Sequence, residues 1–451
     1  MGDDSQATIS PIAEVPAKLP ADCPLAHGQQ TRNVLLYGAN VALVYLAAPV
    51  LYVGLVGAAL CKRLDASDTV SNLPTTAYFW ATILAILVAW YFPFVRVLKP
   101  VLIGAYLSTA TAAAVVAASL VLQENRLVVI AALLGYAVVL GITLQTISTF
   151  QWEVLARGVS ARRRGQALAL AFGGGPVLAV VGSLISQLIL SGRVDLPLNV
   201  GALTLESFGV GSQALGFPWN FAVLFAACVP LMLFAAVLSM LFVVPRPDVE
   251  LTRKPFVSGI FGGFREFWSS RVIKFAVLAT ILVFAGNMII SNLGIYTEEA
   301  TGQKPEQLAG YQNSLRFGFK IIAGLLLGWL LARTNPKAAT LATGLIGIAG
   351  VCWALLVPGK WFLIAFGLLG AGELYGIYYP NYILSCSRPE HVRRNMAFAA
   401  MLPMPASIAP VLFGWLSDNF GHHYSMLAAL LILLASVTLV LVGLPAKPRP
   451  E

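Results

Sequence analysis

Two basic residues and one acidic residue stand inside long apolar segments of the sequence, where charge is costly. Arg316 and Lys320 are four residues apart in LAGYQNSLRFGFKIIAGLLLGWLLAR, so they share one face of a helix. Glu373 stands near the middle of WFLIAFGLLGAGELYGIYYPNYILS. Ionisable groups inside such segments usually face an internal cavity and carry function. Two cations against one carboxylate favour recognition of an anionic group, such as a carboxylate or a phosphate.

The depths of these charges predict an ion pair. If both segments enter a bilayer from the same side, then at 1.5 Å per residue Lys320 and Glu373 both lie roughly 18–20 Å from that boundary. Arg316 lies about 6 Å nearer the boundary, so we expect it to be left for the substrate. The alternative is that the three groups only pair with one another and orient their helices.

Glu373 is the only carboxylate that we place deep in the membrane, and it is therefore the candidate proton carrier for coupled transport. Asn313 extends the stripe of Arg316, and Tyr375 and Tyr378, three residues apart, share a helix face in the segment after Glu373, so these three are candidate substrate contacts. Tyrosines near a membrane boundary also occur as interfacial belt residues, and that alternative stays open for both of them.

The composition of the chain identifies the solvent of its surface as lipid. Of its 451 residues, 58% are hydrophobic and only 11% are charged, whereas soluble domains carry about 25% charged residues. The net charge of +9 comes from short basic clusters between apolar segments. We therefore expect a lipid bilayer rather than a nucleic acid as the macromolecular environment.

Twelve apolar segments are long enough to cross a bilayer, which takes about 20 helical residues. They predict an all-α integral membrane protein with twelve transmembrane helices in two six-helix bundles, at 33–245 and 272–444. A cytoplasmic tail over 1–32, a basic cytoplasmic linker over 246–271 and a tail over 445–451 complete the expected organisation, and we expect no signal peptide.

The distribution of positive charge predicts the orientation. Of the 29 Lys and Arg residues, 21 fall on the side that carries both termini, six on the other side and two inside a span. Positively charged loops stay in the cytoplasm, so both termini are expected there. We expect a multi-pass protein of the cell inner (plasma) membrane.

Short motifs at two helix ends share a spacing. One segment ends in GWLLARTNPK, with Gly328 first and Arg333 five residues on; another ends in GWLSDNFG, with Gly414 and Asp418 four residues apart. With two groups of six spans and a basic connecting loop, these motifs resemble the G-x-x-x-D-R-x-G-R/K-R/K sequence of the major facilitator superfamily. In the first motif the aspartate position is Ala332.

The resemblance implies that Gly328, Arg333, Gly414 and Asp418 form a conformational latch, weakened in the first motif by the missing aspartate. The alternative is that the glycines only allow close helix packing. In this family, helices one, four, seven and ten surround the substrate path. The resemblance therefore adds further candidate substrate contacts: Tyr37, Gln145 and Asn287.

These features together favour secondary active transport of a small organic, anionic solute by alternating access, with proton coupling through Glu373. The alternatives are a passive facilitator of a neutral or zwitterionic solute and a transporter-like membrane sensor. The sequence contains no HExxH, GxSxG or Walker-type motif, so we expect no enzymatic activity, no cofactor and no metal site. We expect a monomer.

Overall fold

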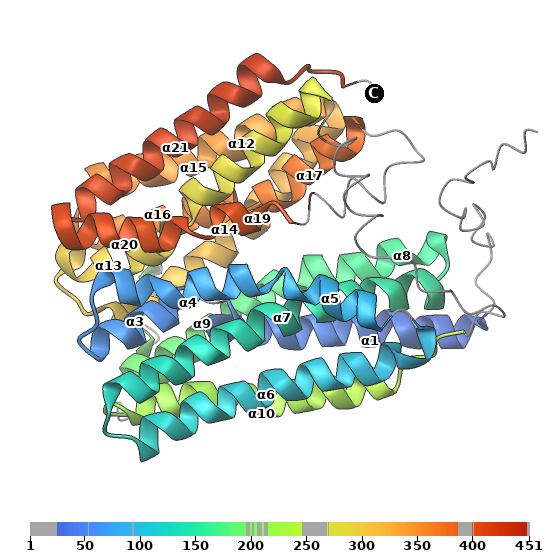
Figure 1. Ribbon diagram of the computed structural model, residues 1–451, viewed down its shortest axis with the longest axis horizontal. Coiled ribbons are helices and arrows are strands. Elements are labelled where there is room, and N and C mark those ends of the chain that lie inside the picture. The colour runs from blue at the N-terminus through green and yellow to red at the C-terminus, as the bar shows by residue number, and fades with distance from the viewer. Residues whose placement is uncertain are drawn as a thin grey trace, which may run out of the picture.

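The helices of the protein form two groups that lie side by side, one from each half of the chain (Figure 1). We describe them from a computed structural model. The described residues are 25–448 without 53, 93, 195–198, 201–202, 205–209, 212–214, 246–267, 269, 387–398 and 400. Most of the expected linker 246–271, and residues 1–24 of the expected N-terminal tail, lie outside this set.

The first group, here the N-terminal bundle, consists of the elements that precede the linker. Its helices are α1 (His27–Leu46), α2 (Ala48–Leu51), α3 (Leu55–Arg63), α4 (Asp68–Ala81), α5 (Leu84–Tyr91), η1 (Val95–Val97), α6 (Leu98–Leu122), α7 (Arg126–Gly158), α8 (Ala161–Leu168), η2 (Ala169–Gly173), α9 (Gly174–Ser191) and α10 (Trp219–Met240).

The second group, here the C-terminal bundle, consists of the elements that follow the linker. Its helices are α12 (Arg271–Asn287), α13 (Ile290–Thr301), α14 (Pro305–Arg333), α15 (Pro336–Leu356), η3 (Gly359–Leu363), α16 (Ile364–Gly372), α17 (Tyr375–Cys386), α19 (Pro403–Ala406), α20 (Ala409–Phe420) and α21 (His422–Gly443). Each bundle has its own apolar core: one runs from Val34 to Phe242 and includes Ala309, and the other runs from Ile273 to Leu444 and includes Leu55.

Ten helical segments in the described ranges are long and apolar enough to cross a membrane. Of the two other expected spans, 33–60 is not a continuous helix, and 394–416 lies partly outside the described residues (394–398 and 400) and is divided in the described part. The first is divided among α1, α2 and α3, with Pro49 at the start of α2 and Gly54 at a φ of 147°. The second contains the short α19 and α20, each with a proline in its first turn. Twelve spans therefore remain a prediction.

The loop between α9 and α10 adds a small β-structure to the expected all-α fold. Strand β1 (Arg193–Val194) pairs antiparallel with β4 (Val210–Gly211), and β2 (Asn199–Val200) pairs antiparallel with β3 (Leu203–Thr204). These two-residue ladders lie within the long connection between α9 and α10.

The described chain begins and ends at the same end of the molecule (Figure 1). We call this the terminal end, and the opposite end, where α3 meets α4 and α20 meets α21, the far end. An even number of crossings follows from this arrangement. Which end faces the cytoplasm stays a prediction from the charge bias.

Candidate functional site

Arg316, Lys320 and Glu373 form one cluster inside the C-terminal bundle, here called the charge triad. The Lys320 Nζ donates to Glu373 Oε2 at 2.5 Å, and the Arg316 Nε donates to Glu373 Oε1 at 2.6 Å. The three side chains are 10–16% exposed. A buried charge is costly unless it is paired and hydrogen-bonded, and the shared carboxylate supplies both conditions.

The Lys320–Glu373 pair agrees with the depths estimated from the sequence. The expectation that Arg316 would have no partner among the three charges is wrong, because Arg316 also binds Glu373. A one-turn offset of about 6 Å is bridged because the long arginine side chain reaches the same carboxylate. The triad therefore contains two cations for one anion and carries a net positive charge.

Close packing of α14 against α16 brings the triad together. A side chain at Gly370 would collide with the backbone of Arg316, and one at Gly367 would meet the Phe319 ring at 2.7 Å. Only glycine lets the two helices approach this closely. The segment GLLGAG thus places Glu373 directly opposite the cationic face of α14.

The helix that carries Glu373 is interrupted at this residue. Helix α16 ends at Gly372 with Glu373 as its C-cap, and α17 begins at Tyr375. Interrupted helices at midplane are typical of transporter binding sites, because irregular backbone is tolerated where it faces protein or a cavity. The expected span 361–386 corresponds to the single membrane-length segment Gly359–Cys386, and the sequence analysis did not predict the interruption within it.

An aromatic cluster joins the charge triad to the N-terminal bundle. The Phe317 ring lies 5.4 Å from the Tyr52 ring and 6.3 Å from the Tyr45 ring, both edge-on. Lys320 Nζ and the Arg316 guanidinium lie 5.2 Å and 5.9 Å from the centroid of the same ring. Phe317 is fully buried, so it separates the two cations from the tyrosines of the opposite bundle.

The other candidates on the C-terminal bundle are buried close to this region. Asn287 donates to the Leu369 carbonyl at 3.5 Å, and its side-chain oxygen accepts no hydrogen bond from described residues. The Tyr375 ring packs on Phe284 at 4.3 Å. Tyr378 packs in a small core with Leu327 of α14, and Asn313 is 2% exposed.

The two remaining candidate contacts belong to the N-terminal bundle. Tyr37 is 2% exposed and packs within the apolar core of that bundle. Gln145 is half-buried in α7. The structure thus gathers the charged candidates into one cluster, whereas Tyr37 packs in the apolar core of the N-terminal bundle.

Asp418 connects the two bundles at the far end. Its carboxylate accepts hydrogen bonds from the N–H groups of Asp68 and Thr69, at 2.8 and 2.9 Å, and from the Thr69 hydroxyl at 2.5 Å. These N–H groups open α4, so the carboxylate also meets the positive end of the helix dipole. A side chain at Gly414 would meet the Asp68 carbonyl oxygen at 2.5 Å, so the glycine permits this approach.

Further polar contacts join the bundles near the same end. Gln187 of α9 accepts from the Gly310 N–H of α14 at 2.9 Å and donates to the Gln307 carbonyl. Asn72 donates to Asn292 at 3.1 Å. His422 lies 2.9 Å from the Asp68 carboxylate and 3.0 Å from Glu299. The far end is therefore closed in this structure.

The motif residues at the end of α14 make contacts of a different kind. The Arg333 guanidinium lies 5.3 Å from the Trp329 ring of its own helix. Gly328 is exposed, with the Tyr378 hydroxyl 4.0 Å from where its Cβ would be. Lys337 instead links helices, since its ammonium donates to the Leu441 carbonyl of α21 at 2.8 Å.

Sequence reasoning missed four residues that lie beside the charge triad or join the bundles at the far end: Tyr52, Phe317, Gln187 and Asp68. Each lies among residues of similar type, and its role depends on a partner from the other half of the chain. Gly310 carried a usable signal, because small residues mark close helix contacts. Within the described ranges no group of three or more His, Cys, Asp or Glu residues could hold a metal ion.

The family model of the Major Facilitator Superfamily matches residues 34–389. The chain belongs to this superfamily of membrane transporters, as its motifs and span arrangement suggested. No curated protein sequence matches it.

Solved structures of transporters share the fold at low sequence identity. A D-xylose–proton symporter has a TM-score of 0.64 and 14% identity over 93% of this chain and 97% of its own. A bacterial homologue of the human lysosomal transporter Spinster, in an inward-facing and unoccupied conformation, has a TM-score of 0.63 and 14% identity over 93% and 98%. The Escherichia coli fucose–proton symporter has a TM-score of 0.58 and 18% identity, over 92% of this chain and 100% of its own.

Replacement of Glu373 by Gln is expected to destabilise the protein. The substitution leaves Arg316 and Lys320 adjacent without a counter-ion, and breaking a buried pair in this way costs about 3–5 kcal/mol. A second substitution, Lys320→Met, removes one of the two cations and should recover part of the loss. Thermal unfolding of the purified variants measures both effects. Equal melting temperatures for wild type and Glu373→Gln would show that the triad contributes nothing to folding.

Proposed function

We propose that the protein is a secondary active transporter of a small organic anion, with the charge triad as its central binding site. The observation that carries the proposal is the excess of two cations over one carboxylate in a mostly buried cluster. Arg316 presents a planar fork of donors that suits a carboxylate or phosphate, and Lys320 adds a point charge. An entering anion would compete with Glu373 for both.

The position of the triad supports alternating access. The charges lie on α14 and α16 of one bundle, and the tyrosines that approach them through Phe317 lie on the other. Rocking of one bundle against the other would therefore change the surroundings of the site while leaving the triad intact. Closure at the far end implies that the solute reaches the site from the terminal end, which the charge bias assigns to the cytoplasm.

The named solved structures favour a second candidate for the solute. Two of them are symporters of sugars and protons. Aromatic rings beside a site, as Tyr45 and Tyr52 are here, also suit a neutral ring-shaped solute. These observations support a neutral solute as the alternative to an anion, and ligand-induced stabilisation separates the two classes of solute.

Ligand-induced stabilisation tests the anionic site. Wild type should melt at a higher temperature with one class of organic anion, because a ligand that binds only the native state stabilises it by mass action. Arg316→Ala and Lys320→Ala should lose this shift. Arg126→Ala, which removes an exposed cation at the far end, is the control and should keep it. Stabilisation by sugars or nucleosides alone, retained in both triad variants, would assign the site to a neutral solute.

Proton coupling is expected to depend on Glu373. In vesicles containing the solute found above, Glu373→Gln should abolish uptake driven by a proton gradient. It should spare counterflow exchange, because exchange needs no net proton movement. Wild-type rates of proton-driven uptake in Glu373→Gln would remove Glu373 from the coupling mechanism.

Asp418 is expected to act as a latch that favours closure of the far end. Asp418 is exposed, so solvent weakens its hydrogen bonds, and Asp418→Ala should shift the opening equilibrium by about fivefold. Spin labels at Glu124 and Gln303, exposed on opposite bundles at the far end, should report a longer-distance population. Asn419→Ala, an exposed neighbour that bonds only within α20, is the control. An unchanged distance distribution in Asp418→Ala would exclude the latch role.

A further inference from the structure

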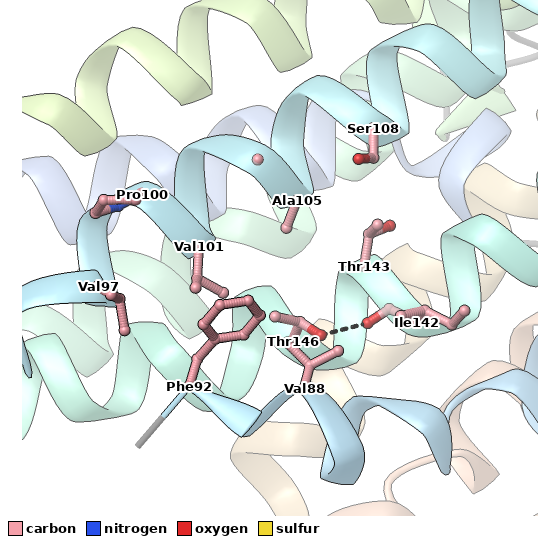
Figure 2. A pocket seen from close by; sticks show the side chains of 11 residues that line it. Val88, Phe92, Val97, Pro100, Val101, Ala105, Ser108, Ile142, Thr143 and Thr146 are labelled. Carbon is pink, nitrogen blue, oxygen red and sulfur yellow. Dashed lines mark hydrogen bonds between the residues drawn. The ribbon is translucent and has the colours of Figure 1, made fainter. Parts of the chain in front are cut away.

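A pocket that the proposed transport site does not use lies between α5, α6 and α7 of the N-terminal bundle (Figure 2). Its volume is about 380 Å³, which falls within the range of about 300–1,000 Å³ for ligand sites. Its walls include Val88, Phe92, Val101, Ala105, Ile142 and Thr143.

The lining of the pocket suits a hydrocarbon chain. The hydroxyls of two lining threonines bond other protein groups. The Thr146 hydroxyl donates to the Ile142 carbonyl at 2.7 Å (Figure 2), and the Thr143 hydroxyl forms a hydrogen bond with that of Thr109 at 2.8 Å. The remaining walls are mostly aliphatic and aromatic. A polar solute would lose its hydration here with few hydrogen bonds in return, which disfavours its binding.

The surface around the pocket faces the bilayer. Gly104 and Ser108 are exposed at its edge on α6. Large apolar side chains beside it are 39–47% exposed: Leu84, Leu87 and Leu107. In a membrane-spanning bundle such side chains contact lipid tails, so an occupant can enter the pocket directly from the lipid.

The length of the pocket matches a single leaflet. The lining residues that come from η1 and α6 extend from Val97 to Ser108. This stretch is about 16 Å long at 1.5 Å per residue. The hydrocarbon core of a bilayer is about 30 Å thick. The pocket therefore spans about one acyl chain, in the leaflet at the terminal end.

Positively charged residues lie at the end of the pocket where the headgroup of a bound lipid would be. Arg96 directly precedes the pocket residue Val97 and is exposed. Lys99 lies one turn along, with its ammonium 3.3 Å from the Met240 carbonyl at the end of α10. Basic residues at the membrane surface attract anionic lipids.

We propose that this pocket binds one acyl chain of an anionic phospholipid, whose phosphate is held by Arg96 and Lys99. The site is separate from the charge triad and does not depend on the identity of the solute. Because its walls come from three helices, a bound lipid would hold α5 against α6 and α7.

Native mass spectrometry of the purified chain, titrated with phosphatidylglycerol or phosphatidylcholine, tests the site. Wild type should retain one phosphatidylglycerol with at least about tenfold preference over phosphatidylcholine. Gly104→Phe should weaken this binding by about tenfold or more, because its ring fills the pocket. Its Cβ would meet no atom within 4 Å, so the substitution fits the fold.

Matched variants separate the parts of the site. Gly135→Phe, on an exposed and equally open position of α7, should bind like wild type. Arg96→Gln should reduce the preference for phosphatidylglycerol while leaving the weaker phosphatidylcholine binding unchanged, and Arg126→Gln at the far end should change neither. Equal affinity of wild type for both lipids would overturn the proposal. Full phosphatidylglycerol binding in Gly104→Phe would also overturn it. So would a dimer without bound lipid that dissociates when Gly104 is replaced, because the pocket would then be a contact between two copies of the chain.

Discussion

The carboxylate of Glu373, shared by Arg316 and Lys320 at 2.5–2.6 Å, is the contact on which the rest of the site depends. Moving three charges out of water is costly, and only close geometry with hydrogen bonds offsets that cost. The geometry in turn requires α14 and α16 to approach until Gly370 touches the backbone of Arg316. A larger residue there would part the helices and separate the charges.

The charges that form the triad lie on one bundle, and this placement shapes the possible motion. A site divided between bundles would lose its ion pairs whenever the bundles moved apart. Here the N-terminal bundle contacts the region of the triad through Tyr45 and Tyr52, which pack against Phe317. Aromatic contacts of this kind tolerate a range of ring orientations. At the far end, by contrast, Asp418 makes specific bonds to α4. Specific hydrogen bonds thus hold the far end in this conformation, and aromatic contacts lie beside the charge triad.

Sequence reasoning predicted the elements that depend on local composition and missed those that depend on tertiary approach. Apolar length and charge bias located most spans, and counting residues along two helices found the Lys320–Glu373 pair. The same count misjudged Arg316, because it measures where a Cα lies and not how far a long side chain reaches. The bonds of Gln187 to α14 join residues more than 100 positions apart in the chain, which no local pattern encodes.

Charge balance links the proposed solute to the proposed coupling. With Arg316 and Lys320 both charged, the triad carries one net positive charge, and a bound monoanion makes the site neutral without any change at Glu373. A dianion would leave a net negative charge in a region where unpaired charge is costly. Protonation of Glu373 would restore neutrality in that case. Under the proposed function, the same three residues would suit uncoupled movement of a monoanion or proton-coupled movement of a dianion, so the proton coupling proposed for Glu373 applies to a dianionic solute.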